Sequence, residues 1–416
     1  KPVPSPDQLR EQQFKINEQI KLDFERAKSI LKPSQKQLEH GLELHRNSLV
    51  IDAYGFMPRA AYDGVLINSA ISSKASQLEI QDMQEDMSMS RFVMDKRERD
   101  EFENAWKASG VTGVIQNAGE EGNEVKRLLK RLAHFTYTTD MMRDFIGKAV
   151  TPDDFIQAKK ENRHVLYFSG NGVPLPQEWV SVEEELRYIS IFFQLGIRMM
   201  HLTYNRRNMI GDGCGEKANG GLSDFGHAVI KEMNRVGVIV DVAHSGWQTS
   251  LEAARLSERP MVASHSTVAS VNKHIRSKPD NVIRAIADTG GYIGICCIPR
   301  FLGGAGDISS MMQHIDYVVK KFGSEHVAIG TDISYTSQFA AEENRKISAN
   351  RQGRTRWEAL WPDDDFRESA EMVQSMSWTN WPLFTVGMVQ MGYSDDIIQK
   401  ILGGNSMRVA KAALAV

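Results

Sequence analysis

The 416-residue chain is 41% hydrophobic and 25% charged, a composition that supports a large buried core and argues against a disordered chain. Its formal net charge of −3, without basic stretches interleaved with aromatic residues, argues against nucleic acid as a partner. Apolar runs stay well short of the roughly 18 residues that a membrane-spanning helix needs. The length allows either two domains or one α/β barrel with insertions.

The first 45 residues have a helical rhythm. Between about Ser5 and His45, apolar residues recur at helical spacing among Lys, Glu and Gln, which predicts one or two amphipathic helices packed on the main body. Pro33 and Ser34 mark the expected break between them. We therefore expect an N-terminal helical extension over residues 1–45, followed by the main domain over residues 46–416.

Short apolar runs then alternate with amphipathic helical patterns about eight times. The predicted strands are Leu49–Ala53, Val111–Gln116, His164–Phe168, Ile197–Leu202, Val236–Ala243, Met261–Ser264, Tyr292–Cys296 and Val327–Gly330. Repeated strand–helix alternation predicts a parallel sheet, and eight repeats favour a closed (β/α)8 TIM barrel. An open doubly wound sheet is the alternative, but a dinucleotide version would need a Gly-x-Gly-x-x-Gly motif after the first strand.

Two segments are too long to be simple connections. One follows the first strand, at about residues 56–94. The other follows the last strand, at about residues 333–381, and carries Trp357, Trp361, Trp378 and Trp381. In a barrel both leave from the rim where active sites lie. A lid over the site is one hypothesis, and a packed surface excursion is the other.

Three predicted strands end in side chains that bind metals. His244 and His265 close the fifth and sixth strands, and Asp332 closes the eighth. If the sheet closes, these side chains converge and could hold a zinc ion with a position open for water, an arrangement typical of metal-assisted hydrolysis. The alternative is a set of hydrogen-bonded structural residues, which is what we expect of His201 at the end of the fourth strand.

Arg276 lies in the segment after the sixth strand. Its forked guanidinium suits a substrate carboxylate, and an exposed basic loop is the equally weighted alternative.

Longer stretches resemble a known family. They are residues 221–226, 232–244, 263–266, 287–294, 329–332 and 402–405. Over residues 46–412 the chain resembles the membrane (renal-type) dipeptidases, a family of zinc metallopeptidases. The resemblance implies a (β/α)8 barrel with two zinc ions at its rim that hydrolyses dipeptides. It implies that His244 and His265 hold the second zinc, that Asp332 binds the first zinc and handles a proton, and that Arg276 receives the dipeptide carboxylate.

The chain departs from this family at four positions. Tyr54 and Phe56 stand where the family has the His and Asp of Asp-Gly-His-x-Asp, and Ser169 replaces the Glu that bridges the two ions. Tyr204 replaces the His that orients the substrate. Three ligands of the first zinc are therefore missing, so we expect at most one zinc ion, at His244, His265 and Asp332, or none. Tyr54 and Tyr204 could supply phenol hydroxyls for acid–base chemistry or substrate contacts.

Three functions remain open from these residues. The first is a metallohydrolase, of dipeptidase type, acting on a small peptide or peptide-like amide. The second is a non-hydrolytic tailoring enzyme that uses Tyr54, Tyr204 and Asp332. The third is a catalytically silent accessory protein. The departures resemble those of an exported branch associated with maturation of the peptide siderophore pyoverdine, which implies a periplasmic location with a signal peptide not visible here. The resemblance also implies a homodimer.

Overall fold

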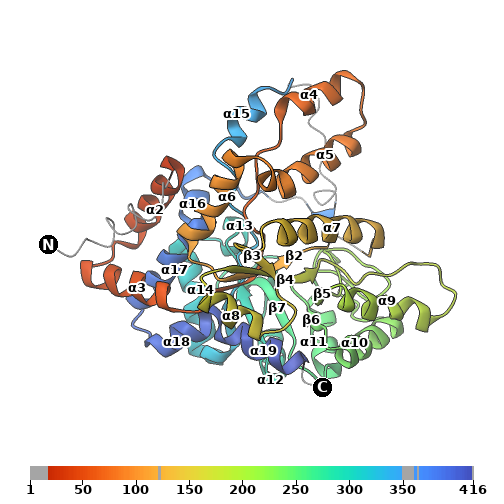
Figure 1. Cartoon of the computed structure of the whole chain (residues 1–416). Helices are drawn as coiled ribbons and strands as arrows, with labels where there is room; N and C mark the ends of the chain where they lie inside the picture. Colours follow the sequence, from red (N-terminus) through yellow and green to blue (C-terminus); the bar gives the residue numbers. More distant parts are fainter. Residues whose placement is uncertain (1–16, 120–122, 349–359, 363–364, 415–416) are drawn as a thin grey trace.

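The computed structural model describes residues 17–119, 123–348, 360–362 and 365–414. Eight parallel strands follow one another around a barrel, with helices outside them (Figure 1). In order around the sheet they are β1 (Ile51–Gly55), β2 (Gly113–Asn117), β4 (His164–Gly170), β5 (Ile197–His201), β6 (Ile239–Asp241), β7 (Val262–Val268), β9 (Tyr292–Ile295) and β10 (Val327–Ile329). All eight coincide with the predicted runs, so the (β/α)8 barrel is confirmed.

The barrel closes between its last and first strands. The backbone N–H of Asp332 donates to the carbonyl of Tyr54 at 3.0 Å, and that of Phe56 donates to the carbonyl of Ile333 at 3.3 Å. These bonds lie just beyond β10 and at the end of β1, at the carboxyl ends of the strands. Closure brings residues from opposite ends of the chain to one rim, as a metal or substrate site at that rim requires.

Strand alternation sorts side chains into two groups. Ile115, Tyr167, Met199 and Ile239 belong to one buried cluster, whereas their neighbours in sequence pack in the larger cluster that includes the surrounding helices. Successive residues of a strand point to opposite faces. The inward phase therefore continues to the strand ends, where the next inward positions are Asn117, Ser169, His201 and Asp241.

Helices surround the barrel and extend beyond one end of it (Figure 1). In chain order they are α2 (Glu18–Leu31), α3 (Gln35–Asn47), α4 (Gly64–Ser72), α5 (Gln77–Ser90), α6 (Lys96–Ser109), α7 (Val125–Met141), α8 (Asp153–Lys160), α9 (Val182–Gln194), α10 (Asp224–Val236), α11 (Trp247–Leu256), α12 (Asp280–Asp288), α13 (Pro299–Leu302), α14 (Ile308–Phe322), α15 (Ala340–Arg345), α16 (Ala370–Ser375), α17 (Trp381–Gln390), α18 (Asp395–Gln399) and α19 (Asn405–Leu414). None of the described helices is long and apolar enough to cross a membrane.

The N-terminal helices α2 and α3 break at Pro33, as predicted. Ser34 begins α3 with a capping box, because its hydroxyl accepts from Gln37 N–H and the Gln37 side chain accepts from Ser34 N–H. Helix α2 packs on α16, and α3 packs on α17. Ile20 and Phe24 thereby join the same buried cluster as the barrel helices.

The two long rim segments contain helices and meet each other. The first carries α4 and α5, and the second carries α15 and α16. Helices α4, α5 and α15 project together from one end of the barrel (Figure 1). The backbone N–H of Gly64 donates to Glu343 Oε2 at 2.9 Å. Trp378 and Trp381 are fully buried, whereas Trp357 lies outside the described residues.

Sequence patterning missed three short features. Two are the strands β3 (Ile146–Lys148) and β8 (Ser277–Lys278), which pair with β4 and β7. The third is a π-helical segment at residues 400–404, which runs from α18 into α19.

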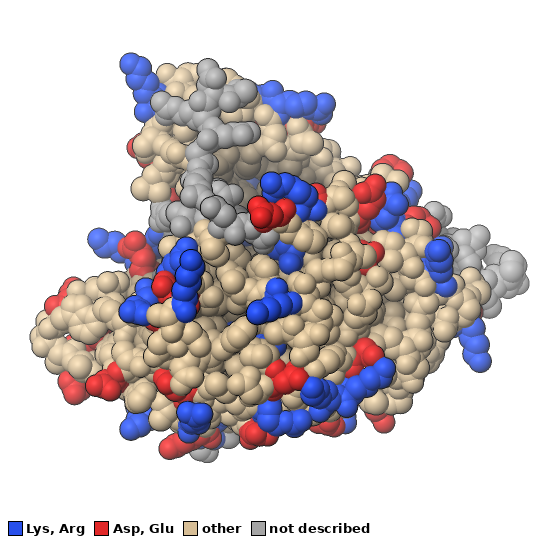
Figure 2. All heavy atoms as spheres, turned by 180° about the vertical axis from the view of Figure 1, so that it is seen from behind, with Lys and Arg blue, Asp and Glu red and all other residues tan. Residues whose placement is uncertain are grey.

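Figure 2 shows acidic and basic side chains interspersed over one face of the molecule, without a broad basic patch over the described residues drawn there.

Candidate active site

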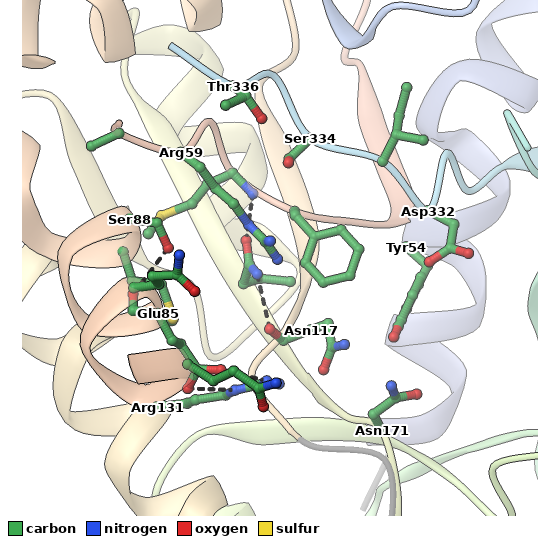
Figure 3. Close-up of a pocket in the computed structure, with 18 of the residues that line it drawn as sticks. Tyr54, Arg59, Glu85, Ser88, Asn117, Arg131, Asn171, Asp332, Ser334 and Thr336 are labelled. Atoms are coloured by element: carbon green, nitrogen blue, oxygen red, sulfur yellow. Dashed lines mark hydrogen bonds and ion pairs between the residues drawn. The ribbon is translucent and has the colours of Figure 1, made fainter. Parts of the chain in front are cut away.

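A cavity of about 690 Å³ opens at the carboxyl ends of the strands. On the barrel side it is lined by Tyr54, Tyr204, His244, Asp332 and Trp361. Its other wall comes from the α5 and α7 side, where Figure 3 shows Glu85 and Arg131 facing each other across from Tyr54 and Asp332. A concave site of this volume suits a small-molecule or short-peptide ligand.

The side chains of His244 and His265 face each other at the barrel end of this cavity. Their Nε2 atoms are 2.9 Å apart. Each Nδ1 has its own partner, because His244 Nδ1 lies 2.8 Å from Asn205 Oδ1 and His265 Nδ1 lies 2.8 Å from Ser264 Oγ. Since an amide oxygen only accepts, His244 carries a proton on Nδ1 and, when neutral, presents a bare Nε2. That lone pair needs either a proton on His265 Nε2 or a cation shared by both rings.

Both imidazoles are held neutral. Burial lowers the pKa of His244 and of His265 well below its usual range, and the nearby Arg276, His201 and Lys278 lower it further. Neutral imidazole is the form that binds a metal. Metal-bound histidines are usually oriented by a hydrogen bond on the ring nitrogen that does not bind the metal. Asn205 and Ser264 occupy that position on Nδ1 of His244 and His265. The donor set therefore fits a zinc ion.

The two tyrosines stack on the two histidines. The rings of Tyr54 and His265 lie 3.9 Å apart at 12°, and those of Tyr204 and His244 lie 4.1 Å apart at 27°. Trp361 Nε1 donates to the Tyr204 hydroxyl at 3.2 Å. Both tyrosines therefore line the cavity beside the histidines, and their chemical role stays a prediction.

Asp332 lies at the same rim with a left-handed backbone. Its φ is +58°, a conformation that costs free energy for a residue with a side chain and that Asp tolerates better than most. Such strain persists where surrounding contacts enforce it, often at functional sites. The bond from Asp332 N–H to the carbonyl of Tyr54 is one such contact. Its role as a metal ligand or proton carrier stays a prediction.

Arg276 is fully buried, which excludes the exposed basic loop. It donates from Nη2 to the carbonyl of His265 at 2.9 Å and from Nε to that of Ala243 at 3.3 Å. Its Nη1 has no hydrogen-bond partner among the described residues. The guanidinium lies 5.1 Å from the Phe301 ring centroid and 5.8 Å from that of Trp361. A buried guanidinium with an unused donor suits an anionic group of a ligand.

Two substituted positions offer no charged ligand. Ser169 is fully buried and donates to the carbonyl of Gln116 at 3.2 Å. The guanidinium carbon of Arg59 lies over the Phe56 ring, 4.8 Å from the ring centroid. The positions where the resemblance implies first-zinc ligands thus hold a neutral hydroxyl, which is a poor zinc ligand, and an aromatic ring, which cannot bind zinc.

Sequence reasoning missed Asp241 and undervalued His201. They are neighbours across β5 and β6, both fully buried, with His201 Nε2 2.6 Å from Asp241 Oδ2. Burial alone would raise the pKa of Asp241, but the adjacent His201 and the bonds from Ser264 bring it below its usual range. The signal that could have found them is the alternation along each strand, which places His201 and Asp241 on the side facing the barrel interior.

Comparison with known proteins gives one family. Membrane dipeptidase (peptidase family M19) matches residues 39–346. Among curated proteins, the dipeptidase verJ of Clonostachys rogersoniana is 28% identical over 220 residues, 52% of this chain and 48% of that protein. The chain thus matches about half the length of this relative.

Solved structures share the fold. An amidohydrolase from Pseudomonas aeruginosa superposes with a TM-score of 0.65 at 23% identity, covering 90% of this chain and 98% of that one. The probable dipeptidase PvdM from Pseudomonas aeruginosa gives 0.64 at 19%, covering 91% and 98%. A metallopeptidase from Rhodobacter sphaeroides, bound to a phosphinate mimic of L-Ala-D-Ala, gives 0.60 at 15%, covering 88% and 100%.

Proposed function

The chain belongs to the membrane dipeptidase family, peptidase family M19, and we propose that it hydrolyses an amide bond in a small peptide or peptide-like substrate. The proposed centre is a single metal site that includes His265, with His244 beside it. The missing first-zinc ligands reduce the family's two-ion arrangement to one ion.

The observation that carries this proposal is the 2.9 Å approach of the two Nε2 atoms. Both rings are neutral, their Nδ1 atoms are already paired, and the bare Nε2 of His244, which lines the cavity, points at His265 Nε2. A zinc ion there would polarise the amide carbonyl and lower the pKa of a bound water.

The chain's own residues supply binding and proton handling. Arg276 Nη1 would take the C-terminal carboxylate, which sets the peptide's direction. Tyr204 would contact the substrate from its place on His244. Asp332 would accept the proton of the attacking water and pass it to the leaving amine, as general acid–base chemistry requires.

A panel of dipeptides with purified protein and added zinc tests the proposal. We expect turnover, and we expect His244→Ala and His265→Ala each to lower kcat/KM by at least about 100-fold. His227→Ala, on helix α10, is the matched control and should keep wild-type activity. Absence of turnover by the zinc-loaded wild type over the whole panel would refute it.

A non-hydrolytic tailoring enzyme is the second candidate, favoured by the two tyrosines stacked on the histidines. In that case Tyr54, Tyr204 and Asp332 would carry out acid–base chemistry on a peptide natural product such as a pyoverdine precursor. Conversion of such a substrate by protein stripped of metal would favour it over hydrolysis. Full dependence on metal would count against it.

A further inference from the structure

Three buried side chains converge below the cavity floor. His201 ends β5, Asp241 ends β6 and His265 lies in β7. One potential ligand atom from each lies within 4.8 Å of the other two, and all three side chains are fully buried. Two imidazoles and a carboxylate are the donor types that catalytic zinc takes.

The contact between His201 and Asp241 is short. Nε2 and Oδ2 are 2.6 Å apart, the distance of an ion pair when His201 is protonated, but the two atoms are not aligned as a hydrogen bond among the described residues. When His201 is neutral and carries its proton on Nδ1, Nε2 and Oδ2 each have a lone pair, and two lone pairs at this distance repel each other. An ion bonded to both atoms would replace that repulsion with two bonds.

Each of the three residues is fixed through its other polar atom. His201 Nδ1 lies 2.5 Å from Asn171 Oδ1. Asp241 Oδ1 accepts from Ala243 N–H at 2.9 Å and from Ser264 N–H at 3.1 Å. His265 Nδ1 is taken by the hydroxyl of Ser264.

Metal ligands are commonly oriented in this way by partners on their second atom. In each residue one atom is bound by the protein and a second faces the shared position, although in His265 that second atom, Nε2, also lies 2.9 Å from His244 Nε2.

We propose that His201, Asp241 and His265 form a site for one divalent transition-metal ion such as zinc. The carboxylate offsets part of the ion's charge, and three protein ligands leave a position open. His244 faces that position, because its Nε2 lies 2.9 Å from that of His265. The site deepens the proposed function, on which it rests for the role of His265, and it replaces Asp332 with His201 and Asp241 as ligands.

Cobalt(II) reports directly on such a site, because its visible absorption depends on coordination. We expect the wild type to bind one equivalent with the strong bands of a four-coordinate ion. His201→Gln and Asp241→Asn should each weaken binding at least about tenfold and change the spectrum. Asp332→Asn, which alters the same cavity but none of the three ligands, should keep both. Circular dichroism confirms that each variant is folded.

Crystals of the cobalt-loaded wild type give a second measurement that needs no variant. We expect an anomalous peak within about 2.0–2.2 Å of His201 Nε2, of an Asp241 oxygen and of a His265 nitrogen. Unchanged cobalt affinity and spectrum in both His201→Gln and Asp241→Asn would overturn the proposal. So would loss of cobalt in Asp332→Asn, failure of the wild type to bind cobalt, or a peak elsewhere.

Dipeptide hydrolysis measured on the same samples separates the two proposals. A cobalt site at these three residues without turnover would refute the proposed hydrolase and keep the site. Turnover combined with a peak at His244, His265 and Asp332 would keep the hydrolase and refute the site.

Discussion

Arg276 provides a direct test of which substrate the cavity takes. Its charge is fully buried, two of its donors bind backbone carbonyls, and Nη1 lacks a partner among the described residues. A substrate carboxylate would give Nη1 the acceptor that it lacks and would pair with the buried charge. Hydrogen bonds to charged groups contribute about 1.5–3 kcal/mol each, and about 1.4 kcal/mol corresponds to a tenfold change.

The wild type should therefore prefer a dipeptide with a free carboxylate over its C-terminal amide by about 10- to 100-fold in kcat/KM. Arg276→Gln should abolish this preference, mainly by slowing hydrolysis of the free dipeptide. Steady-state kinetics on the matched pair of peptides measures the effect. Arg284→Gln, at an exposed position of α12, is the control. Melting curves for each variant separate lost binding from lost folding. Should Arg276→Gln keep the wild-type preference, the assignment of Nη1 to the carboxylate is wrong.

Three further predictions concern the barrel and its rim. Burial raises the pKa of Asp52 to about 7 from its ordinary 3.8. Between about pH 4 and pH 7, Asp52 therefore keeps its proton in the folded protein but has lost it in the unfolded chain. This group should make the free energy of unfolding fall with rising pH over that range, by up to about 4 kcal/mol; denaturant titrations should show a smaller fall in Asp52→Asn. An added Cβ at Gly294 would lie 1.8 Å from the carbonyl oxygen of Ser264, so Gly294→Ala should destabilise the protein by about 1–3 kcal/mol or more. An added Cβ at Gly147 would meet nothing closer than a flexible side chain, at 3.3 Å, so Gly147→Ala should melt near the wild-type temperature. Equal melting temperatures for the two variants would contradict the packing argument. Tyr204→Phe keeps the ring on His244 but removes the hydroxyl, so kcat/KM for the dipeptide should fall about tenfold with little change in melting temperature; an unchanged value would exclude a role for the phenol.

The barrel could be predicted because its eight strands are short, mostly apolar segments that alternate with helical patterns. β3 and β8, with three and two residues, are too short for periodicity to reveal. Helix α5 did leave a signal within the predicted rim loop, since Ser76 and Glu79 form a capping box, but its apolar spacing is weak. The meeting of α4 with α15 joins segments about 280 residues apart, which local patterns do not encode.

The candidate site was only partly accessible from sequence. His244 and His265 were predicted to converge because both follow strands of one barrel, and the short distance between their side chains agrees with that. His201 and Asp241 were not grouped, because their approach depends on the register between β5 and β6. The stacking of Tyr54 and Tyr204 on the histidines depends on rotamers that substitution patterns do not give.

Metal dependence of hydrolysis is the most direct test of the central claim. Protein stripped with a chelator should hydrolyse no dipeptide, and activity should return in proportion to added zinc, reaching its maximum at one equivalent per chain. Elemental analysis of the reloaded protein should find that one ion. Hydrolysis that survives complete metal removal, or zinc-loaded protein that hydrolyses none of the peptides, would contradict the account.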